Sequence, residues 1–244
     1  MYSNEKSDDL EKLHNWMKTM SAKGAIAVIT HKNGDMDTIG SSIALASTFP
    51  QCLACGLHLN RISKIIIKAL SAPFRILSKE HVLWPRSLAG IVVVDASSPS
   101  QIGFDLPKNM PLCIIDHHDT NEWKLTKEDI SIIWPVSATT QIIHAYLERY
   151  HSVCLTEEVR KLLLAGLITD TGRFRHANVE SFLTGVKLLQ DSEIDYHELV
   201  EKLESVKMNS SDRGAIRKAI SKVESLDVGE WYLLKTHAST LESK

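Results

Sequence analysis

Residues 25–41 have the sequence AIAVITHKNGDMDTIGS, which carries the clearest fold signal in the chain. The first part, 25–30, is an apolar, β-favouring run that stops at polar residues, as expected for a strand buried on both faces. A helix-patterned segment follows at 38–49. A buried strand that leads into a helix is typical of proteins that alternate strands and helices around a parallel sheet.

The same alternation continues through most of the chain. Further strand-like apolar runs occur at 65–67, 91–94 and 112–115. Helical patterns occur at 1–20, 139–150, 157–167, 179–190 and 196–205. We therefore predict an α/β fold with a doubly wound, mainly parallel sheet flanked by helices.

The C-terminal region predicts an incomplete second domain. A polar stretch at 206–212 reads as a linker, and a helix-like segment at 213–224 and a strand-like run at 231–234 follow it. The remaining segment is shorter than the ~40 residues below which a domain usually needs staples to fold alone. We predict a first domain at 1–205 and, at 206–244, a linker with the start of a domain that is not completed.

The composition is that of a soluble globular protein. Of its 244 residues, 43% are hydrophobic and 24% charged, and no apolar run reaches the length of a membrane span. The N-terminus lacks the basic and apolar regions of a secretory signal, so we expect a cytoplasmic protein without membrane contact. A net charge of −2 supplies no basic field for long-duplex DNA, and a small anion held by metal is the better-supported partner.

The four cysteines offer weaker signals. Cys52 and Cys55 have the C-x-x-C spacing, but a zinc site would need a second ligand pair, and a redox pair should open a helix. We place this pair at the end of a helix and interpret all four cysteines as buried packing residues.

Candidate metal ligands follow three of the predicted strands, and one more ends a helical run. Because the carboxyl ends of parallel strands share one edge of a sheet, ligands bind there in open α/β proteins. A single histidine or aspartate at a strand end is more often a cap or turn former, but three such strand ends together favour a site. The candidates are His31, Asp35, Asp37, Asp95, Asp116, His117, His118 and Asp170.

Several converging aspartates favour a divalent metal site. Grouped carboxylates repel one another unless cations neutralise them, and an oxygen-rich set with some histidines suits manganese or magnesium. The number of ligands suggests two ions, and the imidazoles favour Mn²⁺, with Mg²⁺ as the alternative. Gly40 and Ser41, at the start of the following helix, either contact an anion or act only as helix caps.

These residues resemble the four motifs of the DHH phosphoesterase superfamily. The matching pattern is His31-x3-Asp35-x-Asp37-x2-Gly40-Ser41, then Asp95, then Asp116-His117-His118, then Asp170-Thr171-Gly172, within about residues 25–205. The superfamily includes RecJ-like exonucleases, nano-RNA and pAp phosphatases, cyclic dinucleotide phosphodiesterases, exopolyphosphatases and family II inorganic pyrophosphatases. The Asp-Thr-Gly-x-Phe-Arg context around Asp170 favours the RecJ-like, nano-RNA and pAp branch.

The resemblance implies a role for each matching residue. His31 and Asp35 would bind the first metal, and Asp95 would bridge both. The second metal would be bound by Asp37, His117 and Asp170. His118 would face the substrate phosphate with support from Asp116, so that these two residues and Asp95 form the catalytic set. Arg173 and Arg175 would contact phosphate, unless they are solvated surface charges.

The implied function is hydrolysis of phosphate esters in short oligonucleotides or small nucleotides, such as nano-RNA, pAp or cyclic dinucleotides. The nucleophile would be a hydroxide held between the metals. Family members carry a second domain with a glycine-rich motif, and 206–244 resembles only its beginning. A catalytically weak metal- and nucleotide-binding module, a pyrophosphatase or polyphosphatase, and a scaffold therefore stay as alternatives. A homodimer is compatible with all of them.

Overall fold

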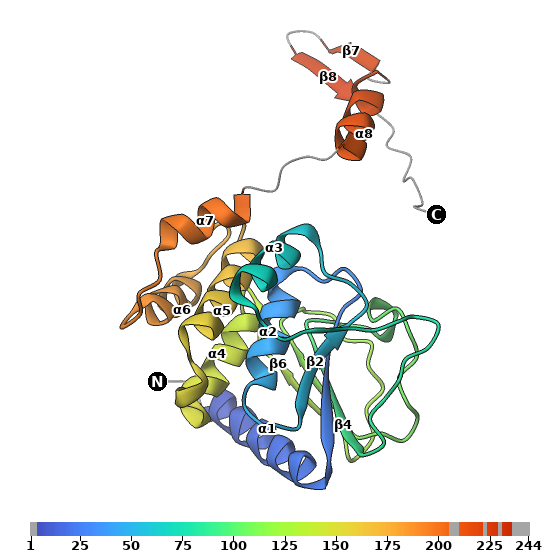
Figure 1. Ribbon diagram of the computed structural model, residues 1–244. Coiled ribbons are helices and arrows are strands. Elements are labelled where there is room, and N and C mark those ends of the chain that lie inside the picture. Colours follow the sequence, from blue (N-terminus) through green and yellow to red (C-terminus); the bar gives the residue numbers. More distant parts are fainter. Residues whose placement is uncertain (1–3, 205–209, 222–223, 229–230, 236–244) are drawn as a thin grey trace. The chain divides into compact units, whose positions relative to one another are not determined.

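The computed structural model describes residues 4–204, 210–221, 224–228 and 231–235 (Figure 1). Contacts within the chain separate two compact units, Met1–Glu204 and Ser205–Lys244. The second unit contains α8 (Ser210–Ile220) and the antiparallel strands β7 (Glu224–Val228) and β8 (Trp231–Lys235).

The elements of the second unit agree in part with those expected from the sequence. Strand β8 is the run expected at 231–234, and α8 begins and ends earlier than the helix expected at 213–224. Strand β7 was not predicted. Of the linker expected at 206–212, residues 206–209 lie outside the described residues, and 210–212 belong to α8.

The first unit is built on a six-stranded sheet in which every pair of neighbours is parallel. The strands lie in the order β3-β2-β1-β4-β5-β6, so the chain winds outward in both directions from the β1–β4 pair. This order confirms the predicted doubly wound fold and opens a crevice where the direction of winding changes. The strands are β1 (Ala25–Thr30), β2 (Cys52–Gly56), β3 (Arg75–Ile76), β4 (Leu88–Val94), β5 (Leu112–Asp116) and β6 (Ile130–Ile133).

The α-helices of this unit pack on one face of the sheet. Each contributes buried side chains to the core on that face, which also contains Val28 and Val92 (Figure 1). The helices are α1 (Asn4–Lys23), α2 (Met36–Ala46), α3 (Arg61–Leu70), α4 (Thr139–Tyr150), α5 (Glu157–Asp170), α6 (Val179–Leu189) and α7 (Tyr196–Glu204). None of these helices, nor α8 in the second unit, is both long and apolar enough to cross a bilayer.

The opposite face of the sheet is covered by loops. Ile29 and Val93 point there and pack with Leu77, Ala96 and Ile102, which come from the connections between strands. The prediction of flanking helices is therefore right for one face only. The reason is that the β4–β5 and β5–β6 connections, which cover the second face, contain short 3₁₀ structure or loop instead of an α-helix.

Two segments have a different secondary structure from the one predicted. The Ile65–Ile67 run, expected as a strand, lies in α3, because the Asn60 side chain caps this helix by accepting from Ser63 N at 2.8 Å. Ile66 is buried whereas Ile65 is 37% exposed, which is the burial pattern of a helix packed on one side.

The Cys52–Cys55 segment is strand β2, not the end of a helix as expected. It pairs with β1 in register, with Ile26 opposite Cys52 and Ile29 opposite Cys55. Burial raises the pKa of both thiols to about 12, which keeps them protonated and favours the packing interpretation. Strands β3 and β6 were also not predicted.

Candidate metal centre

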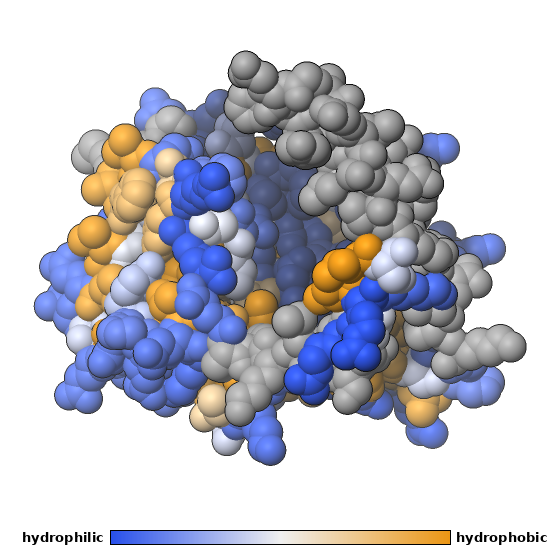
Figure 2. Space-filling view, turned by 90° about the horizontal axis from the view of Figure 1, so that it is seen from above, coloured by the Kyte–Doolittle hydropathy of each residue, from blue (hydrophilic) through white to orange (hydrophobic). Residues whose placement is uncertain are grey.

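The carboxyl ends of three neighbouring strands bring the predicted ligands together. His31 follows β1, Asp95 follows β4, and Asp116 ends β5. Figure 2 looks down on this edge of the sheet, where hydrophilic residues of the first unit gather. The cavity there has a volume of about 220 Å³, and its lining residues are His31, Lys32, Asn33, Asp35, Asp95, Gln101, His117, His118 and Asp170.

Asp95 lies at the middle of this cluster and faces two histidines. Its Oδ2 atom is 3.4 Å from His31 Nε2, and its Oδ1 atom is 3.4 Å from His117 Nε2. His31 Nε2 is also 3.0 Å from Asp35 Oδ2, and His117 Nε2 is 3.4 Å from Asp170 Oδ2. The Asp95 carboxylate therefore lies between two groups of side chains. One group contains His31 and Asp35, and the other contains His117 and Asp170.

Three groups of side chains in this cluster have ligand atoms close enough to hold a metal ion. The atoms of each group lie within 4.8 Å of one another. The groups are His31, Asp35 and Asp95; Asp37, His117 and Asp170; and Asp95, His117 and His118. The donors are carboxylate oxygens and imidazole nitrogens, which suit manganese or magnesium.

The backbone at Asp95 is strained at the point where β4 ends. Its φ is +59°, in the left-handed region that disfavours residues other than glycine. Its N–H still donates to Ile115 O at 2.9 Å, so the strand pairing persists to the point where the chain turns. Such strain costs on the order of 1 kcal/mol and is typical of functional sites.

Asp37 reaches the cluster by capping a helix that is distant in sequence. Its carboxylate is fully buried and accepts from Thr139 N at 2.7 Å and from Thr140 N at 2.8 Å, at the start of α4. The N-cap residue Ala138 has no side chain that could satisfy these N–H groups. Thr139 Oγ1 also donates to Asp95 Oδ1 at 3.3 Å, so the first turn of α4 holds two carboxylates of the centre.

Two glycines allow this contact between α2 and α4. A Cβ atom at Gly166 would lie 2.6 Å from Thr140 Cγ2 and 3.0 Å from Asp37 Cα, and one at Gly40 would lie 2.6 Å from Leu162 O. At either glycine, the contact of 2.6 Å would force the neighbouring atoms to shift. The close packing of α2, α4 and α5 therefore places Asp37 directly against the N-terminus of α4.

The neighbouring histidines 117 and 118 are oriented by separate acceptors. His118 Nδ1 lies 2.6 Å from Asp116 Oδ1, which also accepts from His117 N at 2.8 Å. His117 Nδ1 lies 3.1 Å from Val136 O and donates to it, so Nε2 is the ring atom that faces the carboxylates of Asp95 and Asp170. Orientation of this kind is usual for metal-ligating histidines.

The turn that carries His31 and Asp35 is tightly held. Gly34 has a φ of +58°, and a Cβ atom there would lie 2.0 Å from His58 O. Asp35 Oδ1 accepts from Thr38 N at 3.2 Å and caps α2. Asn33 N donates to His31 Nδ1 at 3.1 Å, which places a proton on Nε2 between the carboxylates. A cation bound at His31 Nε2 would replace that proton and require this turn to adjust, whereas His117 Nδ1 already has an acceptor in Val136 O.

The electrostatics of the cluster favour bound positive charge. Burial, together with the nearby carboxylates of Asp95 and Asp170, raises the pKa of Asp37 well above its ordinary value. Burial lowers the pKa of His31 and of His117, but hydrogen bonds and charge interactions with the carboxylates outweigh it and raise both to about 10. The cluster holds either protons or cations, as expected of carboxylates gathered around a metal site.

Four predicted substrate contacts do not line the cavity. Gly40 and Ser41 lie in α2, where Ser41 is fully buried and Gly40 packs against α5. Arg173 forms an exposed ion pair with Glu204 at 2.7 Å, and Arg175 is exposed. Among the described residues, the cavity lining instead includes Lys32, Asn33 and Gln101, which sequence reasoning missed.

The sequence does contain signals for some of the missed residues. Ser98 and Gln101 have capping-box spacing, and Gln101 Oε1 accepts from Ser98 N at 3.1 Å. Thr139 and Thr140 begin a predicted helix without a capping side chain before them. An uncapped, buried helix start is a sign that a distant acceptor is present.

Comparison with known proteins gives a family match and similarity to several curated proteins. The model of the DHH family, N-terminal domain, matches residues 25–167. The bifunctional oligoribonuclease and PAP phosphatase NrnA of Thermus thermophilus is 29% identical over 167 residues, which are 65% of this chain and 47% of that protein. The manganese-dependent inorganic pyrophosphatase of Methanocaldococcus jannaschii is 25% identical over 233 residues, 83% of this chain and 72% of that protein.

Solved structures agree on the fold. A putative family II inorganic pyrophosphatase of Methanococcus jannaschii has a TM-score of 0.60 at 26% identity, covering 74% of this chain and 61% of that one. An exopolyphosphatase-related protein from Bacteroides fragilis has a TM-score of 0.68 at 19% identity, covering 89% of this chain and 66% of that one. The chain spans about half the length of NrnA, the first of these relatives.

Proposed function

This chain belongs to the DHH family, and from that premise we propose that it is a manganese-dependent phosphoesterase for short oligonucleotides or small nucleotides. The observation that carries the proposal is the shared position of Asp95 between His31 and His117, at 3.4 Å from each. Such sharing supports two adjacent Mn²⁺ ions, with Mg²⁺ as the alternative.

The proposed ligands divide between two ions. His31 and Asp35 would hold the first, and Asp37, His117 and Asp170 the second, with Asp95 between them. Bound divalent cations would polarise a phosphoryl oxygen and supply a nucleophile at neutral pH. The protein contributes fixed ligand positions, which it builds from strand ends and from the N-terminus of α4.

His118 is the proposed contact to the substrate phosphate. Its hydrogen bond to Asp116 raises its pKa, which favours the protonated ring. The ring lines the cavity, and because Nδ1 is engaged by Asp116, Nε2 is the atom that remains for substrate. A protonated imidazole there donates to a phosphate oxygen and holds it for attack.

Two substrate classes compete for this centre. The match to an oligoribonuclease and PAP phosphatase supports nucleotide esters, and the match to an inorganic pyrophosphatase supports pyrophosphate as the second candidate. Hydrolysis of pAp, short RNA, a cyclic dinucleotide and pyrophosphate should be compared in Mn²⁺. We expect the highest kcat/KM with a nucleotide ester, and a preference for pyrophosphate over every ester would contradict the assignment.

A matched pair of aspartate variants tests the centre itself. Loss of an outer partner of a metal site costs about 10–100-fold in affinity or activity. Asp95 is itself a proposed ligand, so Asp95→Asn should cost at least about 100-fold in kcat/KM. Asp119→Asn alters an exposed aspartate just after the histidine pair and should leave activity near wild type. Equal activity of both variants would show that Asp95 has no role in the centre.

A further inference from the structure

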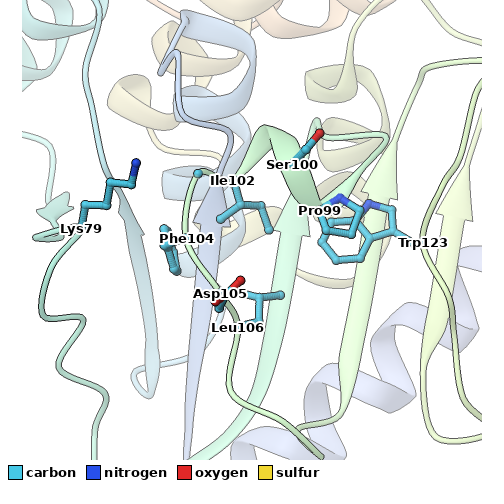
Figure 3. Close-up of a pocket in the computed structure, with 9 residues that line it drawn as sticks. Lys79, Pro99, Ser100, Ile102, Phe104, Asp105, Leu106 and Trp123 are labelled. Carbon is cyan, nitrogen blue, oxygen red and sulfur yellow. The ribbon is translucent and has the colours of Figure 1, made fainter.

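A second cavity lies beside the metal centre. It has a volume of about 610 Å³, within the range of about 300–1,000 Å³ usual for small-molecule sites. Figure 3 shows Lys79 on one side and Pro99 and Trp123 on the other, with Ile102 and Phe104 between them. Its lining residues come from the loops and the short 3₁₀ helix (Pro99–Gln101) that cover the second face of the sheet.

The two cavities share one thin wall. Lys32 lines the metal centre and donates from its ammonium group to Ser100 O at 3.4 Å, and Ser100 lines the second cavity. Lys32 N also donates to Gln101 O at 2.7 Å. A Cβ atom at Gly103 would lie 3.3 Å from Lys32 Cβ, so the wall is closely packed. A ligand that begins at the metal centre would reach the second cavity by passing over Lys32 and Ser100, which lie between the two linings.

The lining combines flat apolar rings with polar groups of both signs. Trp123 is held in place because its Nε1 donates to Ala96 O at 2.8 Å, and Phe104 lies against Trp84 with ring centroids 6.1 Å apart. Lys79 and Asp105 add an exposed donor and an exposed acceptor. Flat rings stack on nucleobases of any sequence, and the polar groups match the acceptors and amino groups at base edges.

We propose that this second cavity binds the nucleobase of a substrate whose phosphate lies at the metal centre. The placement of the phosphate rests on the proposed function. The base would stack on Phe104 or Trp123, within reach of the Lys79 ammonium group. The cavity would then select phosphate esters that carry a base over those that lack one.

Binding of two probes tests this assignment. Adenosine 5′-monophosphate and ribose 5-phosphate should be titrated by calorimetry into the full chain with Mn²⁺ present. Because base stacking is worth about 1–3 kcal/mol, we expect the nucleotide to bind at least about fivefold more tightly. Phe104→Leu keeps apolar volume but removes the flat face, and it should cancel most of this difference without changing the affinity for ribose 5-phosphate.

A pair of exposed lysines supplies a control that does not depend on the core. Lys79→Ala should weaken nucleotide binding about threefold, the loss expected of an exposed charged contact, and leave ribose 5-phosphate unchanged. Lys108→Ala, outside the lining, should change neither affinity. If Phe104→Leu fails to fold, as judged by circular dichroism, the comparison of nucleotide affinity between Lys79→Ala and Lys108→Ala tests the proposal by itself.

The outcomes separate this proposal from the proposed function. Two results would overturn the base cavity even if phosphate esters are hydrolysed. One is equal affinity of the wild type for both probes. The other is an equal loss of affinity for both probes in Phe104→Leu and Lys79→Ala. Selective nucleotide binding that these variants remove would support the cavity even if no ester is cleaved. In that case only the proposed phosphoesterase activity would fail.

Discussion

The two threonines at the start of α4 should differ sharply in their importance for the metal centre. Both donate their backbone N–H to Asp37, and a change of side chain leaves that contact in place. Their hydroxyl groups differ. Thr139 Oγ1 donates to Asp95 Oδ1 at 3.3 Å, whereas Thr140 Oγ1 is buried with no hydrogen-bond partner among the described residues. We predict that Thr139→Val weakens Mn²⁺ binding and Thr140→Val does not.

The expected size of the effect follows from the two contacts. Hydrogen bonds to charged groups contribute about 1.5–3 kcal/mol, and at 3.3 Å the Thr139 bond belongs at the lower limit of that range. A loss of ~1.4 kcal/mol is about tenfold in affinity, near the lower limit of the 10–100-fold seen for outer partners of metal sites. Thr140→Val removes an unsatisfied hydroxyl, so the free energy of unfolding of this variant should equal that of the wild type or exceed it by about 1 kcal/mol.

Calorimetric titration of Mn²⁺ into the wild type and both variants measures the affinity, and kcat/KM with a nucleotide ester measures the consequence for activity. Urea unfolding without metal reports stability separately, so a general loss of structure is distinguished from a local loss of metal affinity. Thr139→Ser retains the hydroxyl without the methyl group and should restore most of the Mn²⁺ affinity.

Equal losses of Mn²⁺ affinity in Thr139→Val and Thr140→Val would refute this reasoning, because they would trace the effect to helix packing. A Thr139→Ser variant as weak as Thr139→Val would refute it as well, since the hydroxyl would then have no part in holding Asp95.

Three further predictions concern the turn, a buried histidine and the charge of the centre. Gly34→Ala should destabilise the fold by at least about 1 kcal/mol in urea unfolding, because φ is +58° and the new Cβ would lie 2.0 Å from His58 O, whereas Gly214→Ala, with nothing within 4 Å, should not. Burial lowers the pKa of His144 from 6.5 to about 4, so the unfolded chain takes up a proton between these values and the folded chain does not. Stability should therefore fall by roughly 3 kcal/mol as pH drops from 6.5 to 4, and His144→Gln should flatten that part of the profile; an unchanged slope would exclude His144 as the cause. Mn²⁺ binding should release protons at pH 7, because the pKa values of His31 and His117 are raised to about 10 in the absence of metal. Calorimetry in buffers of different ionisation enthalpy measures this release, and its absence would mean that Mn²⁺ binds elsewhere.

Much of the candidate metal centre was predictable because its residues lie next to strong local signals. The β1, β4 and β5 strands are short apolar runs that stop at polar residues, and parallel strands necessarily bring those stops to one edge of the sheet. His31, Asp95 and His117 thus follow from pattern alone. Their spacing along the chain also resembles a known family, which the family match confirms.

The sequence by itself determined the parallel α/β fold and the candidate ligands at the strand ends, because a strand buried on both faces has to be apolar and has to end where the chain turns polar. Tertiary structure alone decided the rest. Ile65–Ile67 favours a strand locally, but the Asn60 cap and one-sided burial make it a helix, and the less β-favouring Cys52–Gly56 becomes the partner of β1. The contact of Asp37 with α4 and the cavity beside Lys32 join segments far apart in the chain, and no local pattern specifies such pairs.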